Sequence, residues 1–169
     1  MRNERQEAIR QLALAYRDSE VWHIPQEVKE NFRDQVEFWF KKIPKPVRYL
    51  CDLKEGQPFE SVPQMRSHLE VSGELLMLSE ASHELGRELY TKHRAVHDWF
   101  GHIVPNNQFG GVGEAHAFKV HATQYSADVL PIVFSDVVLA NAYWEHVGSP
   151  WEGERFVNRA DLYPLAGIL

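Results

Sequence analysis

The sequence predicts one α+β domain that is mostly α-helical and contains a small β-sheet of few strands. A chain of 169 residues that is 44% hydrophobic is long enough to bury a sizeable core in one domain. Apolar residues recur at helical spacing over most of the chain, whereas two short segments, 47–51 and 75–78, have the pattern of strands. The chain contains no internal repeat or low-complexity segment, so we expect residues 1–169 to form a single domain.

The first 44 residues predict two helices. Over residues 3–17, apolar side chains such as Leu12 alternate with charges in a pattern typical of a surface helix. Over residues 25–43 the apolar positions again follow helical spacing, and Pro25 fits a first helical turn. Residues 1–44 are therefore expected to form an N-terminal helical part.

The middle of the chain, residues 45–147, predicts short strands followed by longer helices. Prolines and glycines separate the elements. We expect a strand at 47–51, a turn at 54–58, a helix at 61–69, a strand at 75–78, a helix at 83–102, a loop at 105–113 and helices at 115–124 and 131–147. Residues 148–169 contain two prolines and are expected to form an irregular covering tail.

Composition limits the classes of function. The net charge of -6 comes from scattered charges with no long basic run, which disfavours binding to duplex nucleic acid. The N-terminus lacks a signal peptide and no stretch has membrane-spanning length, so we expect a cytoplasmic protein without membrane association. Cys51 is the single cysteine, which excludes an intrachain disulfide and a thiolate zinc cluster.

The run His97-Asp98-Trp99-Phe100-Gly101-His102 concentrates metal-ligand chemistry in a predicted helix. Residues five apart on a regular α-helix differ by about 140° in azimuth and about 7.5 Å along the axis. His97 and His102 can therefore share one ion only at the helix end, or if Gly101 allows the last turn to bend. Asp98 could cap the helix or accept a hydrogen bond from a ligating imidazole.

Further polar residues follow in the next two helices. Glu114 and His121 lie on one helical face, and His116 lies on the opposite face and is expected to be exposed or structural. Asp136 falls in an apolar run, where an isolated carboxylate needs a partner. His93 lies one turn before His97 and could join the site, but it adjoins two basic residues and is expected to be exposed.

The candidate ligands are imidazoles and carboxylates without sulfur, a set that suits Fe(II), Mn(II) or Zn(II). Two histidines and one carboxylate would leave coordination positions open, as catalytic sites require. The alternative interpretation is a buried hydrogen-bond network in which the same side chains only stabilise the core.

The stretch RAVHDWFGH, residues 94–102, resembles the HDxFGH domain of phage and mobile-element polyvalent proteins. The resemblance covers about residues 45–147. In that family the motif is followed by Gly-Glu, by a histidine seven residues later, and by an acidic residue and an asparagine five apart. It implies a polar site of His97, His102, Glu114, His121 and Asp136. The family usually has glutamate where this chain has Asp136.

The pair His97 and His102 is more distantly similar to the iron-binding core of the biopterin-dependent aromatic amino acid hydroxylases. That similarity implies that both histidines bind iron. It also implies that the carboxylate ligand comes from a later helix, with Asp136 first and Glu114 next.

The leading hypothesis is a phage-type metalloenzyme with one divalent metal ion, Fe(II) being favoured and Zn or Mn possible. The expected ligands are His97, His102 and Asp136, and the expected catalytic residues are Glu114, His121 and Asp98. The reaction would be oxygenase-like hydroxylation or hydrolysis, with a substrate that the sequence does not identify. The alternative hypothesis is a non-enzymatic phage-encoded inhibitor that binds a host protein in the host cytoplasm.

Overall fold

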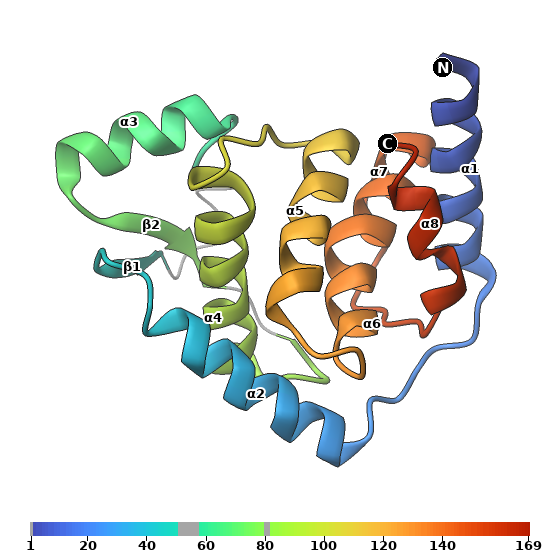
Figure 1. The fold of residues 1–169 in the computed structure, drawn as a ribbon, viewed down its shortest axis with the longest axis horizontal. Helices are drawn as coiled ribbons and strands as arrows, with labels where there is room; N and C mark the ends of the chain where they lie inside the picture. The colour runs from blue at the N-terminus through green and yellow to red at the C-terminus, as the bar shows by residue number, and fades with distance from the viewer. Residues whose placement is uncertain (1, 51–57, 80–81) are drawn as a thin grey trace.

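The computed structural model describes residues 2–50, 58–79 and 82–169, and it confirms a mostly helical α+β fold with a small sheet (Figure 1). In chain order the elements are α1 (Arg2–Asp18), α2 (Gln26–Phe40), β1 (Val47–Leu50), α3 (Val62–Ser72), β2 (Leu75–Leu78), α4 (Arg87–His97), η2 (Asp98–Ile103), α5 (Gly111–Gln124), α6 (Leu130–Val133), η3 (Phe134–Leu139), α7 (Ala140–Val147), η4 (Ala160–Leu162) and α8 (Tyr163–Ala166). The segments η2 and η3 are π-helical, and η4 is a 3-10 turn. Within the described ranges, none of the helices combines the length and the apolar character that crossing a membrane requires.

The sheet consists of β1 and β2, which pair in parallel with Val47 opposite Leu75. Parallel neighbours need a crossover connection, and α3 lies in that connection. The side chain of Ser61 caps the start of α3, and Gly73 ends the helix with a positive φ of 75°. The sequence predicted both strands, although Cys51 and positions 54–57 of the expected turn lie outside the described residues.

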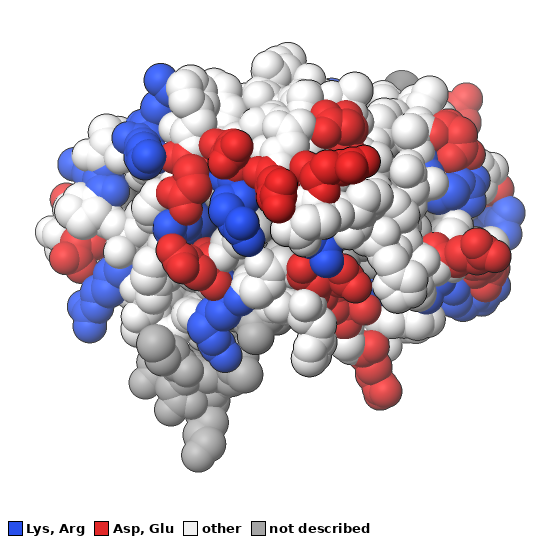
Figure 2. All heavy atoms as spheres, turned by 90° about the horizontal axis from the view of Figure 1, so that it is seen from below, with Lys and Arg blue, Asp and Glu red and all other residues white. Residues whose placement is uncertain are grey.

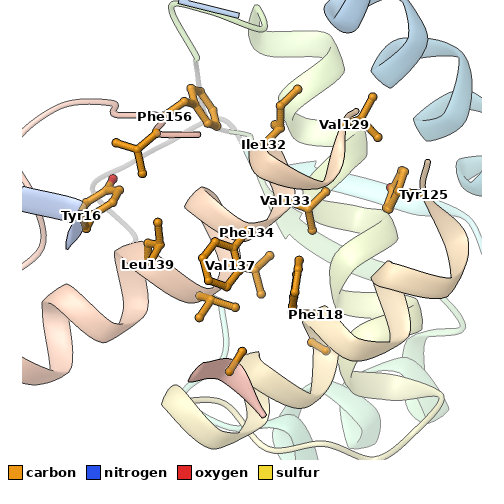
Figure 3. Packing of buried hydrophobic residues seen from close by; sticks show 14 of the residues in the cluster. Tyr16, Phe118, Tyr125, Val129, Ile132, Val133, Phe134, Val137, Leu139 and Phe156 are labelled. Carbon is orange, nitrogen blue, oxygen red and sulfur yellow. The ribbon is translucent and has the colours of Figure 1, made fainter. Parts of the chain in front are cut away.

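The main hydrophobic core forms where α1, α5, η3 and α7 meet (Figure 3). Phe118 of α5 packs on Phe134 of η3, with ring centroids 4.9 Å apart. Leu12 from the N-terminal part and Val157 from the C-terminal segment belong to the same cluster. The N-terminal, middle and C-terminal parts of the chain therefore share one core.

A smaller hydrophobic cluster lies beside the sheet. It joins residues of α3, β2, α4 and η2, namely Val62, Met65, Leu69, Leu75, Met77, Ala95, Trp99 and Ile103. The continuous helix formed by α4 and η2 contributes to both clusters, with Val96 in the main one and Trp99 in the smaller one. A further side of η2 contacts α5, and the candidate site forms at that contact.

Two expectations for secondary structure were wrong in part. Helix α5 begins at Gly111, inside the predicted loop 105–113, so that two glycines of that loop lie in its first turn. Glycine at 113 permits the close approach of the Gln108 carbonyl, which a Cβ there would overlap. The C-terminal tail is not wholly irregular, since it forms η4 and α8. Pro164 lies in the first turn of α8, where a helix tolerates proline.

Positive and negative side chains are interspersed on the face shown in Figure 2. Some of the surface ion pairs join segments that are distant in sequence. Lys29 contacts Glu84 at 2.6 Å, and Lys92 contacts Glu37 at 2.6 Å. The second pair connects α2 to α4, the helix that leads into the candidate site.

Candidate metal centre

The π-helical turn η2 brings His97 and His102 onto one side of the chain. The backbone N–H of Val104 donates to the Trp99 carbonyl at 2.9 Å, and that of Asn107 donates to the His102 carbonyl at 3.1 Å. Hydrogen bonds between residues five apart widen the helical turn and align side chains with that spacing. The Nε2 atoms of His97 and His102 consequently lie 3.0 Å apart. The sequence predicted that the two histidines could share an ion only at the helix end or where Gly101 allowed a bend, and the π-helical turn at 98–103 brings them together instead.

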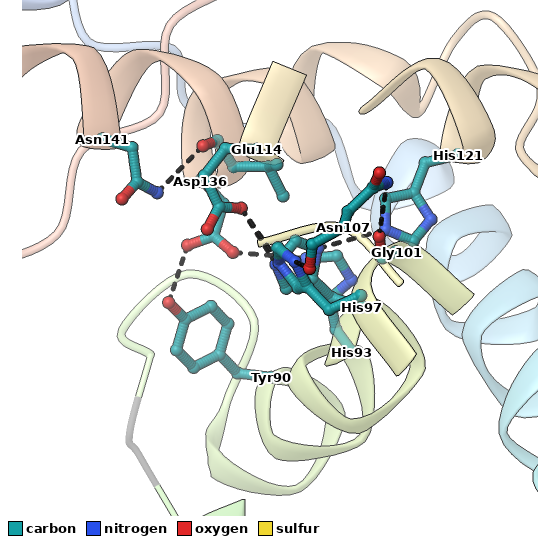
Figure 4. Close-up of polar contacts among 11 residues, drawn as sticks. Tyr90, His93, His97, Gly101, Asn107, Glu114, His121, Asp136 and Asn141 are labelled. Atoms are coloured by element: carbon teal, nitrogen blue, oxygen red, sulfur yellow. Dashed lines mark hydrogen bonds and ion pairs between the residues drawn. The ribbon is translucent and has the colours of Figure 1, made fainter. Parts of the chain in front are cut away.

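Glu114, in the first turn of α5, adds a carboxylate to the two histidines (Figure 4). Its Oε2 atom lies 3.2 Å from His97 Nε2 and 3.3 Å from His102 Nε2. Ligand atoms bound to one ion at about 2.0–2.2 Å and at right angles to one another are about 3 Å apart. The separations of these three atoms therefore fit a shared metal ion.

The three side chains are buried. His102 has no exposed surface, and His97 and Glu114 are each 6% exposed. Although both imidazoles lie within ion-pair distance, the Glu114 Oε2 atom has no hydrogen bond to any described residue. A buried carboxylate oxygen without a hydrogen bond is costly, and a bound cation would satisfy it.

Electrostatics favour the ligating form of the carboxylate. Burial alone would raise the pKa of Glu114, but the neighbouring His102 and His97 lower it to about 2. Burial alone would lower the pKa of His102, but Glu114 and other acceptors raise it overall. Glu114 is therefore ionised at neutral pH, which is the form that binds a metal.

His121 lies behind His97 rather than beside Glu114. Its Nε2 atom is 3.1 Å from His97 Nδ1, and its own Nδ1 atom is 2.8 Å from Gln124 Oε1. Burial and the nearby His97 lower the pKa of His121 well below the usual value. His121 is thus a neutral, fully buried partner of His97. The residues that line the adjoining cavity do not include it.

The expectation that Asp136 binds the metal with His97 and His102 was wrong, because Asp136 contacts His93 instead. It accepts a hydrogen bond from the Tyr90 hydroxyl at 2.7 Å, and its Oδ2 atom lies 3.3 Å from His93 Nε2 (Figure 4). Burial alone would raise the pKa of Asp136, but His93, Arg94 and Tyr90 lower it. Asp136 is not in the group of ligand atoms around His97, so the carboxylate beside the two histidines is Glu114.

The expectation that His93 is exposed was wrong. His93 has no exposed surface, and its ring packs edge-on against Phe32 with centroids 5.1 Å apart. Its place four residues before His97 was the signal for burial, because residues four apart share a helical face. His116, by contrast, is exposed as expected.

A cavity of about 830 Å³ adjoins the centre. His97, His102 and Glu114 form part of its wall, as do Asp136 and the half-buried Asp98. Further aromatic and arginine side chains of the wall are Tyr90, Trp144, Trp151, Arg87, Arg94 and Arg155. An ion at the three ligand atoms would therefore be accessible to a small molecule in the cavity.

Gly101 allows η2 to pack directly against α5. A Cβ atom at this position would lie 2.8 Å from Ala117 Cβ and 3.3 Å from His121 Nε2. The sequence singled out Gly101 as a possible bend, but this close approach is a second reason for glycine. Sequence reasoning missed Asn107 and Gln124, which contact the outer ring nitrogens of His102 and His121.

Comparison of the chain with protein-family models, curated proteins and solved structures found no match in any of the three. Within the described ranges, a group of metal-ligand side chains whose ligand atoms all lie within 4.8 Å of one another is formed by His97, His102 and Glu114. The case for a function therefore depends on the chemistry and geometry of these residues.

Proposed function

We propose that the protein is a metal-dependent enzyme with a mononuclear centre at His97, His102 and Glu114. The observation that supports this most strongly is the convergence of three buried ligand atoms within 3.3 Å of one another in the wall of a cavity. A metal ion would offset the charge of Glu114 and give its Oε2 atom a partner.

The ligand set is that of a catalytic site rather than a structural one. Structural zinc sites are closed by four protein ligands, whereas two histidines and one carboxylate leave positions open. Two histidines and a carboxylate on one side of an ion also form the facial triad of non-haem Fe(II) oxygenases. We therefore favour Fe(II), with Zn(II) or Mn(II) as alternatives.

The ion would supply a Lewis acid and, if it is iron, reactivity toward dioxygen. The protein residues would orient the substrate and accept protons. Asp98 and Asp136 are carboxylates of the same cavity wall and could orient a substrate there, although the lowered pKa of Asp136 makes it a poor proton acceptor. We propose an oxygen-dependent oxidation of a small organic molecule as the reaction, and hydrolysis if the native ion is zinc.

The resemblance of residues 94–102 to the HDxFGH domain is consistent with the proposal. Of the five residues that it implies, His97, His102, Glu114 and His121 lie in contact with one another, and Asp136 lies outside the group of ligand atoms. On this basis we also propose an origin in a phage or mobile element.

Elemental analysis of protein purified without a histidine tag tests the proposal. We expect about one iron, manganese or zinc per chain after anaerobic loading, and none in His97→Ala/His102→Ala or in Glu114→Gln. His116→Ala is the matched control, because His116 is exposed on the same helix as Glu114. Failure of the wild-type protein to take up Fe(II), Mn(II) or Zn(II) would favour the host-protein inhibitor instead.

Metal identity then decides the reaction. Oxygen uptake that depends on Fe(II) and on an added organic substrate would support oxidation. Hydrolysis of chromogenic esters or phosphate esters by the zinc form alone would support the hydrolytic alternative.

A further inference from the structure

A chain of three buried or half-buried side chains leads outward from the candidate centre. His97 faces Glu114 and His102 with Nε2 and faces His121 with Nδ1. The other ring nitrogen of His121 faces the Gln124 side chain at 2.8 Å. Gln124 is the last residue of α5 and lies about one helical turn after His121, and this series of side-chain contacts ends there.

The direction of these hydrogen bonds follows from the Gln124 side chain, at the outer end of the series. Gln124 presents Oε1, an acceptor, so His121 Nδ1 must donate. In a neutral imidazole the other nitrogen then has a lone pair, so His121 Nε2 accepts a hydrogen bond from His97 Nδ1. The Nε2 atom of His97 is left with a lone pair directed at the centre.

We infer that Gln124 and His121 are positioning residues that hold His97 in the tautomer able to bind metal through Nε2. This inference rests on the proposed metal centre. A donor in place of Gln124 Oε1 would reverse both hydrogen bonds and put a proton on His97 Nε2, where it would block an ion.

The two histidine ligands are held differently. His102 Nδ1 lies 3.2 Å from the backbone carbonyl of Asn107, an acceptor that no substitution removes. His97 depends on the Gln124 side chain. The indole N–H of Trp39 donates to the Gln124 backbone carbonyl at 3.1 Å, which fixes the position of the residue. A variant of Gln124 can therefore change one ligand and leave the other unchanged.

Two substitutions at one position test the inference. Gln124→Leu removes the acceptor, and Gln124→Glu keeps an acceptor that cannot donate when ionised. Thr123→Leu, at an exposed neighbour, is the matched control. Titration with Zn(II) against a competing chelator should show roughly 10- to 100-fold weaker binding for Gln124→Leu, the usual effect of losing such a partner. Gln124→Glu and Thr123→Leu should bind at least as tightly as wild type.

Nitrogen-15 NMR of the histidine rings provides a readout independent of metal. In the metal-free protein we expect His97 protonated at Nδ1 in wild type and Gln124→Glu, and a mixture of tautomers in Gln124→Leu. Unchanged tautomers and unchanged zinc affinity in Gln124→Leu would overturn the inference. If wild type takes up no metal, the proposed function fails, and the His97 tautomers alone decide whether Gln124 acts as proposed.

Discussion

His97 and His102 are five residues apart, yet their Nε2 atoms lie 3.0 Å from each other because the helix between them is π-helical. A regular α-helix would direct the two side chains about 140° apart. π-Helical turns are rare and occur frequently at functional sites. The local widening of this helix is therefore the structural basis of the candidate centre.

Gly101→Ala should damage this arrangement. The new methyl group would lie 2.8 Å from Ala117 Cβ, so η2 must move away from α5 and from Glu114. We expect a loss of roughly 1–2 kcal/mol in the free energy of unfolding, because overpacking outweighs the better helix propensity of alanine. Urea denaturation measures the loss, and zinc affinity should fall with it.

The double variant Gly101→Ala/Ala117→Gly is the control for that mechanism. Removal of the Ala117 methyl group relieves the overlap, although glycine inside α5 costs about 1 kcal/mol by itself. The double variant should therefore be more stable than the sum of the two single changes predicts, by about 1 kcal/mol. Strict additivity would show that the close contact at Gly101 is not the cause.

Metal addition should stabilise the wild-type protein. An ion at about 100 times its dissociation constant adds roughly 2.7 kcal/mol, which is about 5–10 °C in melting temperature for a chain of this size. Differential scanning fluorimetry with Zn(II), Mn(II) or anaerobic Fe(II) measures this. Glu114→Gln should show no shift, and His116→Ala should show the full shift. An equal shift in Glu114→Gln would place the bound ion elsewhere.

The sequence predicted the longer elements because their apolar stripes and breaking residues are local properties. Helix α2 is an example, since Pro25 precedes it and Pro44 follows it. The π-helical turn η2 was not predictable in the same way. Its apolar positions, such as Trp99, suit an α-helix equally well, and only Gly101 indicated an irregular turn.

The choice of carboxylate depends on tertiary packing. Glu114 and Asp136 are both acidic residues in apolar helical surroundings, and the similarity to the aromatic amino acid hydroxylases favoured Asp136 as the ligand. In the structure, Tyr90 and His93 contact Asp136, and the approach of α5 to η2 brings Glu114 to the histidines. The basic neighbours of His93 predict exposure, whereas the helical face that it shares with His97 buries it.

Asp136→Asn should lower stability at neutral pH. The Asp136 carboxylate accepts a hydrogen bond from Tyr90, and bonds to charged groups contribute about 1.5–3 kcal/mol. The pKa of Asp136 is lower in the folded protein than in the unfolded chain, where it is about 3.9. The ionised carboxylate therefore adds to the free energy of unfolding above about pH 3.9, and this stabilisation is lost as the pH falls toward the folded-state pKa. The advantage of wild type over Asp136→Asn should thus persist at pH 5 and shrink at pH 3.

Urea denaturation at pH 7, 5 and 3 provides that comparison. Asp34→Asn is the control, because Asp34 is exposed on α2 and its substitution should change stability by less than about 0.5 kcal/mol. If the free energies of unfolding of wild type and Asp136→Asn differ as much at pH 3 as at pH 5, the ionised carboxylate is not the stabilising group.

Arg155 should stabilise the cavity wall without affecting the centre. Its Nε donates to the Tyr16 carbonyl at 2.6 Å, its terminal nitrogen donates to the Ser19 carbonyl, and its guanidinium lies 5.1 Å from the Trp151 ring centroid. Arg155→Met should reduce the free energy of unfolding by roughly 1–3 kcal/mol and leave zinc affinity unchanged. Arg155→Lys should recover only part of the loss, because an ammonium group lacks the planar fork that reaches both carbonyls. Full recovery by lysine would show that charge, rather than this fork, connects the C-terminal segment to α1.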